Sequence, residues 1–194
     1  MKILDDIAGC EICADRFAQT HSAHRPRPVV WFRPCARILI AGQAPGARVH
    51  GSGRPFTDPS GDRLRDWMGV DEATFYDRDL VAILPMAFCF PGYDAKGSDL
   101  SPPKICAKTW RAPVLEALGD VRLTLLVGGY AQAWHLRDKA SVTARVEAWR
   151  DHGPDVFPLP HPSWRNTAWL KRNPWFEEEL LPVLRARVAE ELAR

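Results

Sequence analysis

The amino-acid sequence predicts an α/β protein, a three-layer α/β/α domain whose central sheet has four parallel strands. Two observations predict this fold. Four short apolar runs recur along the chain with helical stretches between them, and strands that alternate with helices pair in parallel. The runs are apolar throughout, as expected of strands buried on both faces. With 194 residues, 46% of them hydrophobic, the chain suits one core, so a single domain over residues 1–194 is expected.

The predicted strands and helices follow one another in regular order. The strands are expected at residues 37–41, 80–84, 123–127 and 156–159. The helices are expected at residues 60–68, 104–118, 130–136, 141–149 and 176–192. Gly119 is expected to end the second helix, and Pro182 to kink the last helix or mark where it restarts. Residues 44–59 and 90–103 are expected to be loops.

Two of the segments that follow predicted strands carry the residue types of a binding site. The first strand stops abruptly at Gly42-Gln-Ala-Pro-Gly46, and the fourth is followed by His161-Pro-Ser163. In an open α/β sheet the site lies at the carboxyl ends of the strands. We therefore expect a glycine-lined backbone pocket and a histidine to meet there, which indicates a nucleotide or base as the ligand.

The composition narrows the choice of partners and compartment. The net charge is +2, but residues 16–57 hold seven arginines and no Asp or Glu. Such a segment is typical of a surface that faces phosphates, although a solvated arginine-rich loop has the same composition. The chain has no apolar run of membrane-spanning length and no basic-then-apolar leader, so we expect a cytoplasmic protein without a membrane partner. A monomer is expected.

Four of the five cysteines have the spacing of a metal site. They are Cys10, Cys13, Cys89 and Cys106. Four thiolates hold either a [4Fe–4S] cluster or a structural zinc ion, and free thiols are the third alternative. A disulfide framework is not expected in a cytoplasmic protein. The fifth residue, Cys35, is expected to be a small buried hydrophobic side chain.

Taken together, these motifs resemble the uracil-DNA glycosylase superfamily. Gly42-Gln-Ala-Pro-Gly46, followed by Gly53-Arg-Pro-Phe56 and Ser60-Gly61, is similar to the first motif of that superfamily, and His161-Pro-Ser163 is similar to its second. The cysteine layout is similar to the cluster ligands of its iron–sulfur-containing bacterial and archaeal branch (family 4-like). The resemblance covers most of the chain. It implies a monofunctional DNA glycosylase of base excision repair with a structural [4Fe–4S] cluster, zinc being the alternative.

The resemblance also implies roles for the residues of the two motifs. His161 would stabilise the leaving base at a carbonyl, Phe56 would stack on the flipped base, and Gln43 would position water. The expected base-binding residues are Gly42, Ala44, Pro45, Gly46, Phe56 and Asp58. The iron–sulfur branch usually has Glu in place of Gln43, and the amide cannot take a proton from the water. Asp58 or His50 could assist.

The segment after His161 predicts a contact with DNA. His161-Pro-Ser-x-Arg-Asn166 is similar to the second motif of the single-strand-selective monofunctional uracil glycosylases, whose loop wedges into the duplex. By that resemblance Trp164 and Arg165 would fill the space left by the flipped base. The expected DNA-binding residues are Ser163, Trp164, Arg165, Asn166, Lys171 and Arg172. Trp175 is expected to pack against a helix or the core, and Trp169 is open to the same interpretation.

Other functions remain open at this point. The resembled branch carries an Asn shortly before its third cluster cysteine, and residues 84–89 contain none, so the base removed is uracil or a different one. A non-catalytic or abasic-site-binding member of the superfamily is one alternative. A hydrolase or transferase of free nucleotides is another, although a small ligand requires neither the basic segment nor the Trp/Arg loop.

Overall fold

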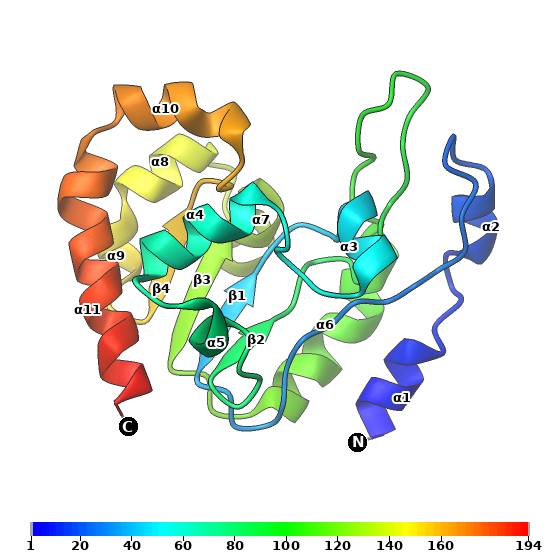
Figure 1. Ribbon diagram of the computed structural model, residues 1–194, viewed down its shortest axis with the longest axis horizontal. Coiled ribbons are helices and arrows are strands. Elements are labelled where there is room, and N and C mark those ends of the chain that lie inside the picture. Colours follow the sequence, from blue (N-terminus) through cyan, green and yellow to red (C-terminus); the bar gives the residue numbers. More distant parts are fainter. Residues whose placement is uncertain (1, 194) are drawn as a thin grey trace.

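The computed structural model describes residues 2–193, which form a four-stranded parallel sheet with helices on both faces (Figure 1). The sheet order is β2-β1-β3-β4. The strands are β1 (Ile38–Ala41), β2 (Val81–Ile83), β3 (Leu123–Val127) and β4 (Val156–Leu159). The predicted fold class is therefore confirmed, and each predicted strand lies within one or two residues of its expected place.

The helices and helical turns occupy most of the remaining chain. In order they are α1 (Lys2–Ala8), α2 (Ala14–Ala18), α3 (Ala47–Ser52), α4 (Pro59–Met68), α5 (Glu72–Phe75), α6 (Lys104–Leu118), α7 (Gly129–Leu136), α8 (Val142–Glu147), α9 (Trp149–His152), the 3-10 turn η1 (Trp164–Asn166), α10 (Thr167–Arg172), the π-helical turn η2 (Phe176–Leu180) and α11 (Leu181–Leu192). Among these helices, none has the length and apolar character needed to span a membrane.

Alternate residues of each strand pack on opposite faces of the sheet. On one face, Ile38 and Ile40 of β1 join a core formed with α4, α5, α8, α9, η2 and α11. On the other face, Leu39 packs with α1 and α6, and Leu126 of β3 packs with α7. Because both faces are covered, the strands need apolar residues at every position, which is why they read as unbroken apolar runs.

Three expectations about the elements need correction. The segment 44–59 is not a loop throughout, because it contains α3; none of the residues of α3 is buried, so no apolar stripe marked the helix. The helix expected at 141–149 is broken at Ala148 into α8 and α9. Cys35 is exposed rather than buried, in a turn before β1 where its φ is +77°. Pro182 marks a restart, since η2 ends just before it and α11 begins.

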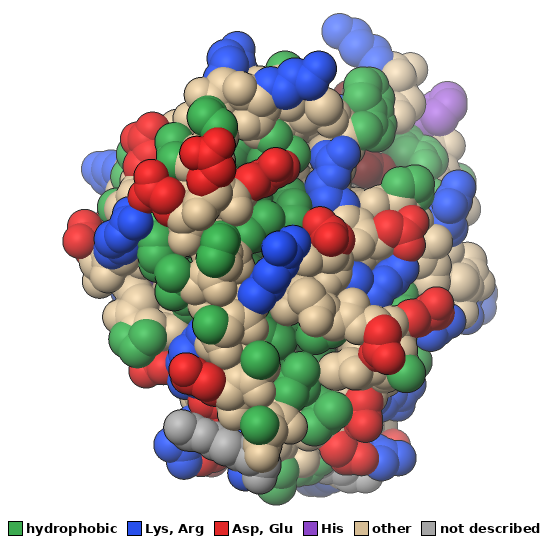
Figure 2. Space-filling view, turned by 60° about the vertical axis from the view of Figure 1, so that its left-hand side comes forward, with side chains coloured by type: hydrophobic (Ala, Val, Ile, Leu, Met, Phe, Trp, Pro, Cys, Tyr) green, Lys and Arg blue, Asp and Glu red, His purple; other side chains and the backbone are tan. Residues whose placement is uncertain are grey.

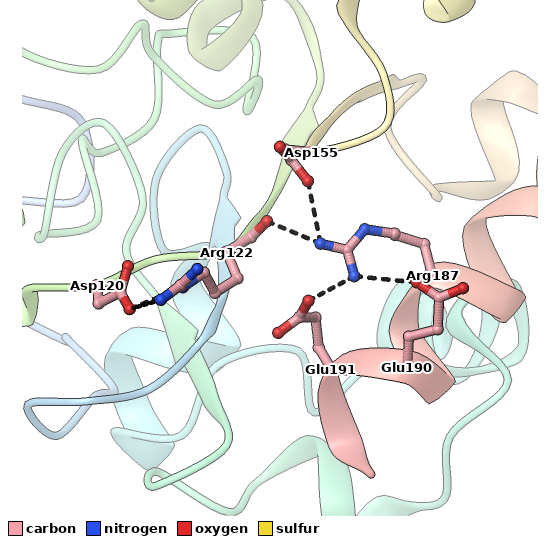
Figure 3. Close-up of polar contacts among 6 residues, drawn as sticks. All are labelled: Asp120, Arg122, Asp155, Arg187, Glu190 and Glu191. Atoms are coloured by element: carbon pink, nitrogen blue, oxygen red, sulfur yellow. Dashed lines mark hydrogen bonds and ion pairs between the residues drawn. The ribbon is translucent and has the colours of Figure 1, made fainter. Parts of the chain in front are cut away.

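The amino ends of β3 and β4 are held by α11 (Figure 3). Arg187 of α11 donates to Oδ1 of Asp155 at 3.0 Å, immediately before β4, and to the carbonyl of Arg122 at 3.4 Å, immediately before β3. Glu190 and Glu191 of the same helix also pair with Arg187. This polar network lies at the amino ends of β3 and β4, opposite to the turns at residues 42–46 and 161–163, so it supports the sheet without occupying the carboxyl ends of the strands.

The carboxyl ends of all four strands lie together at the opposite end of the sheet. Gly128 follows β3 with φ of +82°, which favours glycine, and its N–H donates to the carbonyl of Leu159 at 2.9 Å. Gln132 of α7 is fully buried and donates to the same carbonyl at 2.9 Å. These bonds fix where the chain leaves β4, and so fix the start of the turn that contains His161.

Candidate active site

The turn after β1 is held by the segment that follows β2. The N–H groups of Met86 and Ala87 donate to the carbonyls of Gly42 and Gln43 at 2.9 and 3.1 Å. Gly42 is buried, and a Cβ at this position would lie 3.9 Å from Cζ of Phe56. The absence of a side chain at Gly42 therefore lets the Phe56 ring approach the backbone of the turn. Residues 44–46 then complete the turn, and Gly46 stands immediately before α3.

Phe56 is held in place through its backbone. The residue has φ of +54°, and its carbonyl accepts a hydrogen bond from the Tyr76 hydroxyl at 2.9 Å. Gly61 of α4 packs directly on this carbonyl, since a Cβ there would lie 1.9 Å from the Phe56 oxygen. The ring stands edge-on to Phe75, with centroids 6.0 Å apart, and is half-buried. These contacts give a fixed aromatic ring beside Gly42.

The protonation state of His161 follows from its hydrogen bond. Nδ1 accepts from the backbone N–H of Ser163 at 3.2 Å, so the proton of the neutral ring is on Nε2. Burial lowers the pKa of His161, and the charges of Asp58 and Asp99 oppose that shift. The imidazole is thus a neutral hydrogen-bond donor. Its Cβ lies 3.7 Å from the position that a Cβ on Gly128 would take, beside the end of β3.

Asp58 links the two turns of the site by its charge rather than by a contact. It follows Phe56 by two residues, and its Oδ1 accepts from the Ser60 hydroxyl at 2.6 Å. Its charge reaches His161, where it acts on the pKa of the imidazole. Phe56 lies beside Gly42, and the charge of Asp58 acts on the pKa of His161. The glycine-rich turn, the aromatic ring and the histidine therefore lie together at the carboxyl ends of the strands.

The segment 161–166 has a fixed base and an exposed tip. Nδ2 of Asn166 donates to the carbonyl of His161 at 2.7 Å, and Arg63 of α4 donates to the carbonyl of Ser163 at 3.1 Å. Trp164 is 76% exposed, with the Arg165 guanidinium 6.0 Å from the centre of its ring. The Asn166 side chain thus holds the turn, and its contact with DNA stays a prediction. Arg63 was missed by sequence reasoning, because nothing local indicates a contact with Ser163.

The basic and aromatic residues beyond this turn divide into two groups. Lys171 and Arg172 are exposed in the last turn of α10. Figure 2 shows basic side chains along the upper rim of the face that it presents. Trp169 and Trp175 pack edge-to-face at 5.9 Å, and Nε1 of Trp169 donates to the Thr143 hydroxyl at 2.8 Å. The two tryptophans therefore have a packing role, as expected for Trp175.

Three arginines of the basic segment 16–57 make polar contacts within the protein, although Arg27 and Arg33 remain exposed. Arg27 donates to the carbonyls of His50 and Gly51, which links the irregular segment before β1 to α3. Arg33 pairs with Asp79, and Arg54 pairs with Glu72 while its guanidinium lies 3.7 Å from the centre of the Tyr76 ring. Arg27 and Arg54 therefore hold the chain near α3, whereas Arg33 and Asp79 lie at the amino ends of β1 and β2. That the segment faces phosphates stays a prediction.

The four cysteines with metal-site spacing line one pocket, together with apolar residues of α1, α2 and α6. All five cysteines are free thiols. Burial, together with the neighbouring thiols, raises the pKa of Cys89 to about 12 and that of Cys106 to about 11. Within residues 2–193, no three Cys, His, Asp or Glu side chains are placed to hold a single metal ion.

Asp99 also acts electrostatically on the site, and the sequence did not predict this. It lies in the loop expected at 90–103, and its charge acts on both His161 and Arg165. The only available signal was an acidic residue in a glycine- and proline-rich loop at the carboxyl end of a strand. That signal is common, and nothing in the sequence pairs residue 99 with residue 161.

Replacement of Gly61 tests how tightly the Phe56 backbone is held. Gly61→Ala should lower the free energy of unfolding by about 1–3 kcal/mol, because the new methyl group overlaps the Phe56 carbonyl. Gly51→Ala is the matched control: nothing lies within 4 Å of its Cβ position in α3, so stability should be unchanged or slightly higher. Urea unfolding of both variants gives the comparison, and equal stabilities would show that the 1.9 Å contact has no such consequence.

The sheet and the residues of this site match one protein family. The model described as the uracil DNA glycosylase superfamily matches residues 30–185. The matched span contains all four strands, both turns of the site, Cys89 and Cys106. It begins after Cys10 and Cys13, so the match does not include the first two cysteines.

Proposed function

The chain belongs to the uracil DNA glycosylase superfamily, and on this premise we propose that it excises a damaged base from DNA, with uracil the first candidate. Membership of the superfamily implies DNA glycosylase activity in general, and DNA as the substrate. The reaction proposed for this chain is hydrolysis of the N-glycosidic bond of a base that has been flipped out of the helix, without cleavage of the strand. This is the opening step of base excision repair.

The state of His161 is the observation that carries the proposal. Negative charge builds on the base as the bond from its ring nitrogen to C1′ breaks, and a fixed donor stabilises that charge most effectively in a partly buried site. The hydrogen bond from Ser163 leaves an N–H at Nε2, and burial keeps the ring neutral by lowering its pKa. His161 would therefore donate from Nε2 to a carbonyl oxygen of the departing base.

The other residues of the two turns complete the proposed site. The face of Phe56 would stack on the extruded base, beside the backbone of the turn at residues 42–46. Gln43 is half-buried in that turn and would orient the water that adds to C1′. An amide can hold the water by a hydrogen bond, but the proton of the water has to be accepted elsewhere.

The exposed tip of the second turn would contact the DNA. Arg63 and Asn166 fix the base of the turn, so the tip can be inserted without a large loss of conformational entropy. Trp164 and Arg165 would occupy the gap that the extruded nucleotide leaves in the stack. Ser163, Lys171 and Arg172 would lie near the phosphates.

We also propose that the four cysteines hold a structural [4Fe–4S] cluster, which would place the chain in the iron–sulfur branch. The donor set fits, since four free thiols line one pocket. A single zinc ion needs every sulfur at about 2.3 Å from one point, whereas each thiolate of a four-iron cluster binds a different iron. Among residues 2–193 no three such side chains are placed to hold a single metal ion, which counts against zinc bound by this arrangement of thiols. When bound, it would cross-link the N-terminal segment to the segment after β2 and to α6.

A second candidate function is binding of abasic sites without catalysis. It is favoured by Gln43, because the amide stands where the resembled branch has a carboxylate. The same turn geometry would then recognise a missing base rather than remove one.

Excision assays with variants of the two central residues test the proposed function. Single-turnover release of uracil, hypoxanthine and xanthine should be measured from single- and double-stranded oligonucleotides. His161→Ala should slow release about 100- to 1,000-fold by removing the donor to the base. Phe56→Ala should slow it about 5- to 150-fold through lost stacking.

The control for these two variants is His152→Ala, on α9 near the start of β4, which should retain wild-type rates. Normal excision by the His161 variant would overturn the mechanism. Binding to abasic DNA without release of any base would support the second candidate function. Turnover of free nucleotides alone would assign the chain to another class of enzyme.

Arg165→Ala tests insertion into the duplex. Excision from double-stranded DNA should fall about tenfold, while excision from single strands should change by less than about twofold, because only the duplex has a gap to fill. Arg150→Ala, which removes an exposed arginine that pairs with Glu179, serves as the control and should leave both rates unchanged. An equal loss on both substrates would count against insertion.

Removal of single cysteines tests the cluster. Purified protein should be brown, with broad absorbance near ~400 nm and iron bound to the chain. Cys89→Ser or Cys106→Ser should lose the colour and the bound iron, whereas Cys35→Ser, at the exposed fifth cysteine, should keep both. A colourless wild-type protein with stoichiometric zinc, or with no metal, would contradict the assignment.

A further inference from the structure

We propose that Asp99 is a catalytic carboxylate of this site, supplied by the loop after β2 in place of an acid in the first turn. This inference rests on the glycosylase function proposed above. It concerns the step for which the first turn has no suitable group, because Gln43 can orient a water molecule but cannot accept its proton.

Asp99 lies on an ordered hairpin, which projects at the top of Figure 1 between β2 and α6. Tyr93 and Asp99 form an isolated antiparallel bridge, and the N–H of Leu100 donates to the carbonyl of Gly92 at 2.8 Å. Oδ1 of Asp94 accepts from the backbone N–H groups of Lys96 and Ser98, which closes the tip. Backbone hydrogen bonds of the hairpin therefore fix the position of Asp99.

Two anchors hold the hairpin against the rest of the protein. On one side, the Ser22 hydroxyl accepts from the N–H of Tyr93 at 3.3 Å, and the N–H of His21 donates to the Tyr93 carbonyl at 3.2 Å. On the other side, the hydroxyl of Tyr130 donates to the Ser101 hydroxyl at 2.7 Å. Asp99 lies between these anchors, so neither strand of the hairpin is free to move away from the site.

The second anchor places Asp99 relative to the histidine. Tyr130 is in the first turn of α7, which begins immediately after Gly128, and the Cβ of His161 packs on Gly128. The strand that carries Asp99 and the turn that carries His161 thus meet at the start of the same helix. In agreement with this placement, the charge of Asp99 acts on His161 and Arg165.

Of the two acids near His161, Asp99 has the carboxylate that is available for chemistry. Asp58 accepts from the Ser60 hydroxyl at 2.6 Å. The Asp99 carboxylate, by contrast, has no hydrogen bond or ion pair with any residue from 2 to 193. Although Asp99 is exposed at the surface, partial desolvation of its carboxyl raises its pKa, and the charge of Arg165 lowers it by less. A carboxylate with a raised pKa is a better proton acceptor than an ordinary one.

The proposed step breaks one bond at C1′ and forms another. The bond from C1′ to the base nitrogen breaks and its electron pair leaves with the base, whose carbonyl is held by His161. The oxygen of water forms a new bond to C1′, which has become electron-poor. Asp99 accepts the proton that this water loses and then returns it to the base nitrogen through solvent. The products are the free base and an abasic deoxyribose, and no oxidant, reductant or other reactant is needed.

Asp99→Asn tests the assignment, since it keeps the shape of the side chain and removes its charge. Single-turnover excision at saturating enzyme should slow by about 100-fold or more, while the affinity for uracil-containing DNA should stay within about twofold. Asp99→Glu should recover part of the rate. Lys96→Ala, at the exposed tip of the same hairpin, is the matched control and should behave as wild type.

The pH profile separates a chemical role from a structural one. Wild-type excision should fall toward acid pH as Asp99 becomes protonated, and this fall should be smaller in Asp99→Asn. The charged and titratable groups around Asp99 are His161, Arg165 and, through Ser101, Tyr130, with Asp58 on the far side of His161. Asp58→Asn should leave the Asp99-dependent part of the profile in place.

Different results of these assays would overturn the role of Asp99 or the proposed function itself. Excision by Asp99→Asn within about threefold of wild type would overturn the role of Asp99 and leave the proposed glycosylase function intact. A loss that appears in Asp58→Asn and not in Asp99→Asn would assign the step to the other carboxylate. A wild-type protein that releases no base would refute the proposed function, and the role of Asp99 would fall with it.

Discussion

The parallel pairing of β3 with both of its neighbours is the constraint on which the rest of the structure depends. Ala41 at the end of β1 pairs with Leu126, and Leu159 at the end of β4 pairs with Val127. The two turns of the site therefore leave the sheet on either side of Gly128. That residue has no side chain, so His161 can pack against it while α7 begins. The histidine and the glycine-rich turn meet because the strands are paired in this register.

The fold could be predicted where burial leaves a pattern in the sequence. All four residues of β1 are buried, and the run Ile38–Ala41 reads as a strand for that reason. No residue of α3 is buried, and that helix had no apolar stripe to reveal it. The prediction that Cys35 is buried was wrong. The residue lies in a turn with φ of +77° that leaves its side chain exposed, and the apolar residue type gave no sign of that turn.

The candidate site could be predicted only where its residues are close in sequence or resemble a known motif. Phe56 and His161 were found in this way, and the structure adds what holds them: the Tyr76 hydroxyl and Gly61 for one, Ser163 and Asn166 for the other. The charge of Asp99 acts on His161 only because of contacts made by the hairpin and α7. Such contacts join distant segments, and a single sequence contains no record of them.

A crystal structure of the wild-type protein with DNA that carries a 2′-fluorinated deoxyuridine, which resists cleavage, tests the central claim most directly. The account predicts an extruded uracil with its face on Phe56 and Nε2 of His161 within hydrogen-bond distance of a base carbonyl. A uracil that stays stacked in the DNA, or one bound away from the two turns with His161 facing only phosphate, would contradict it.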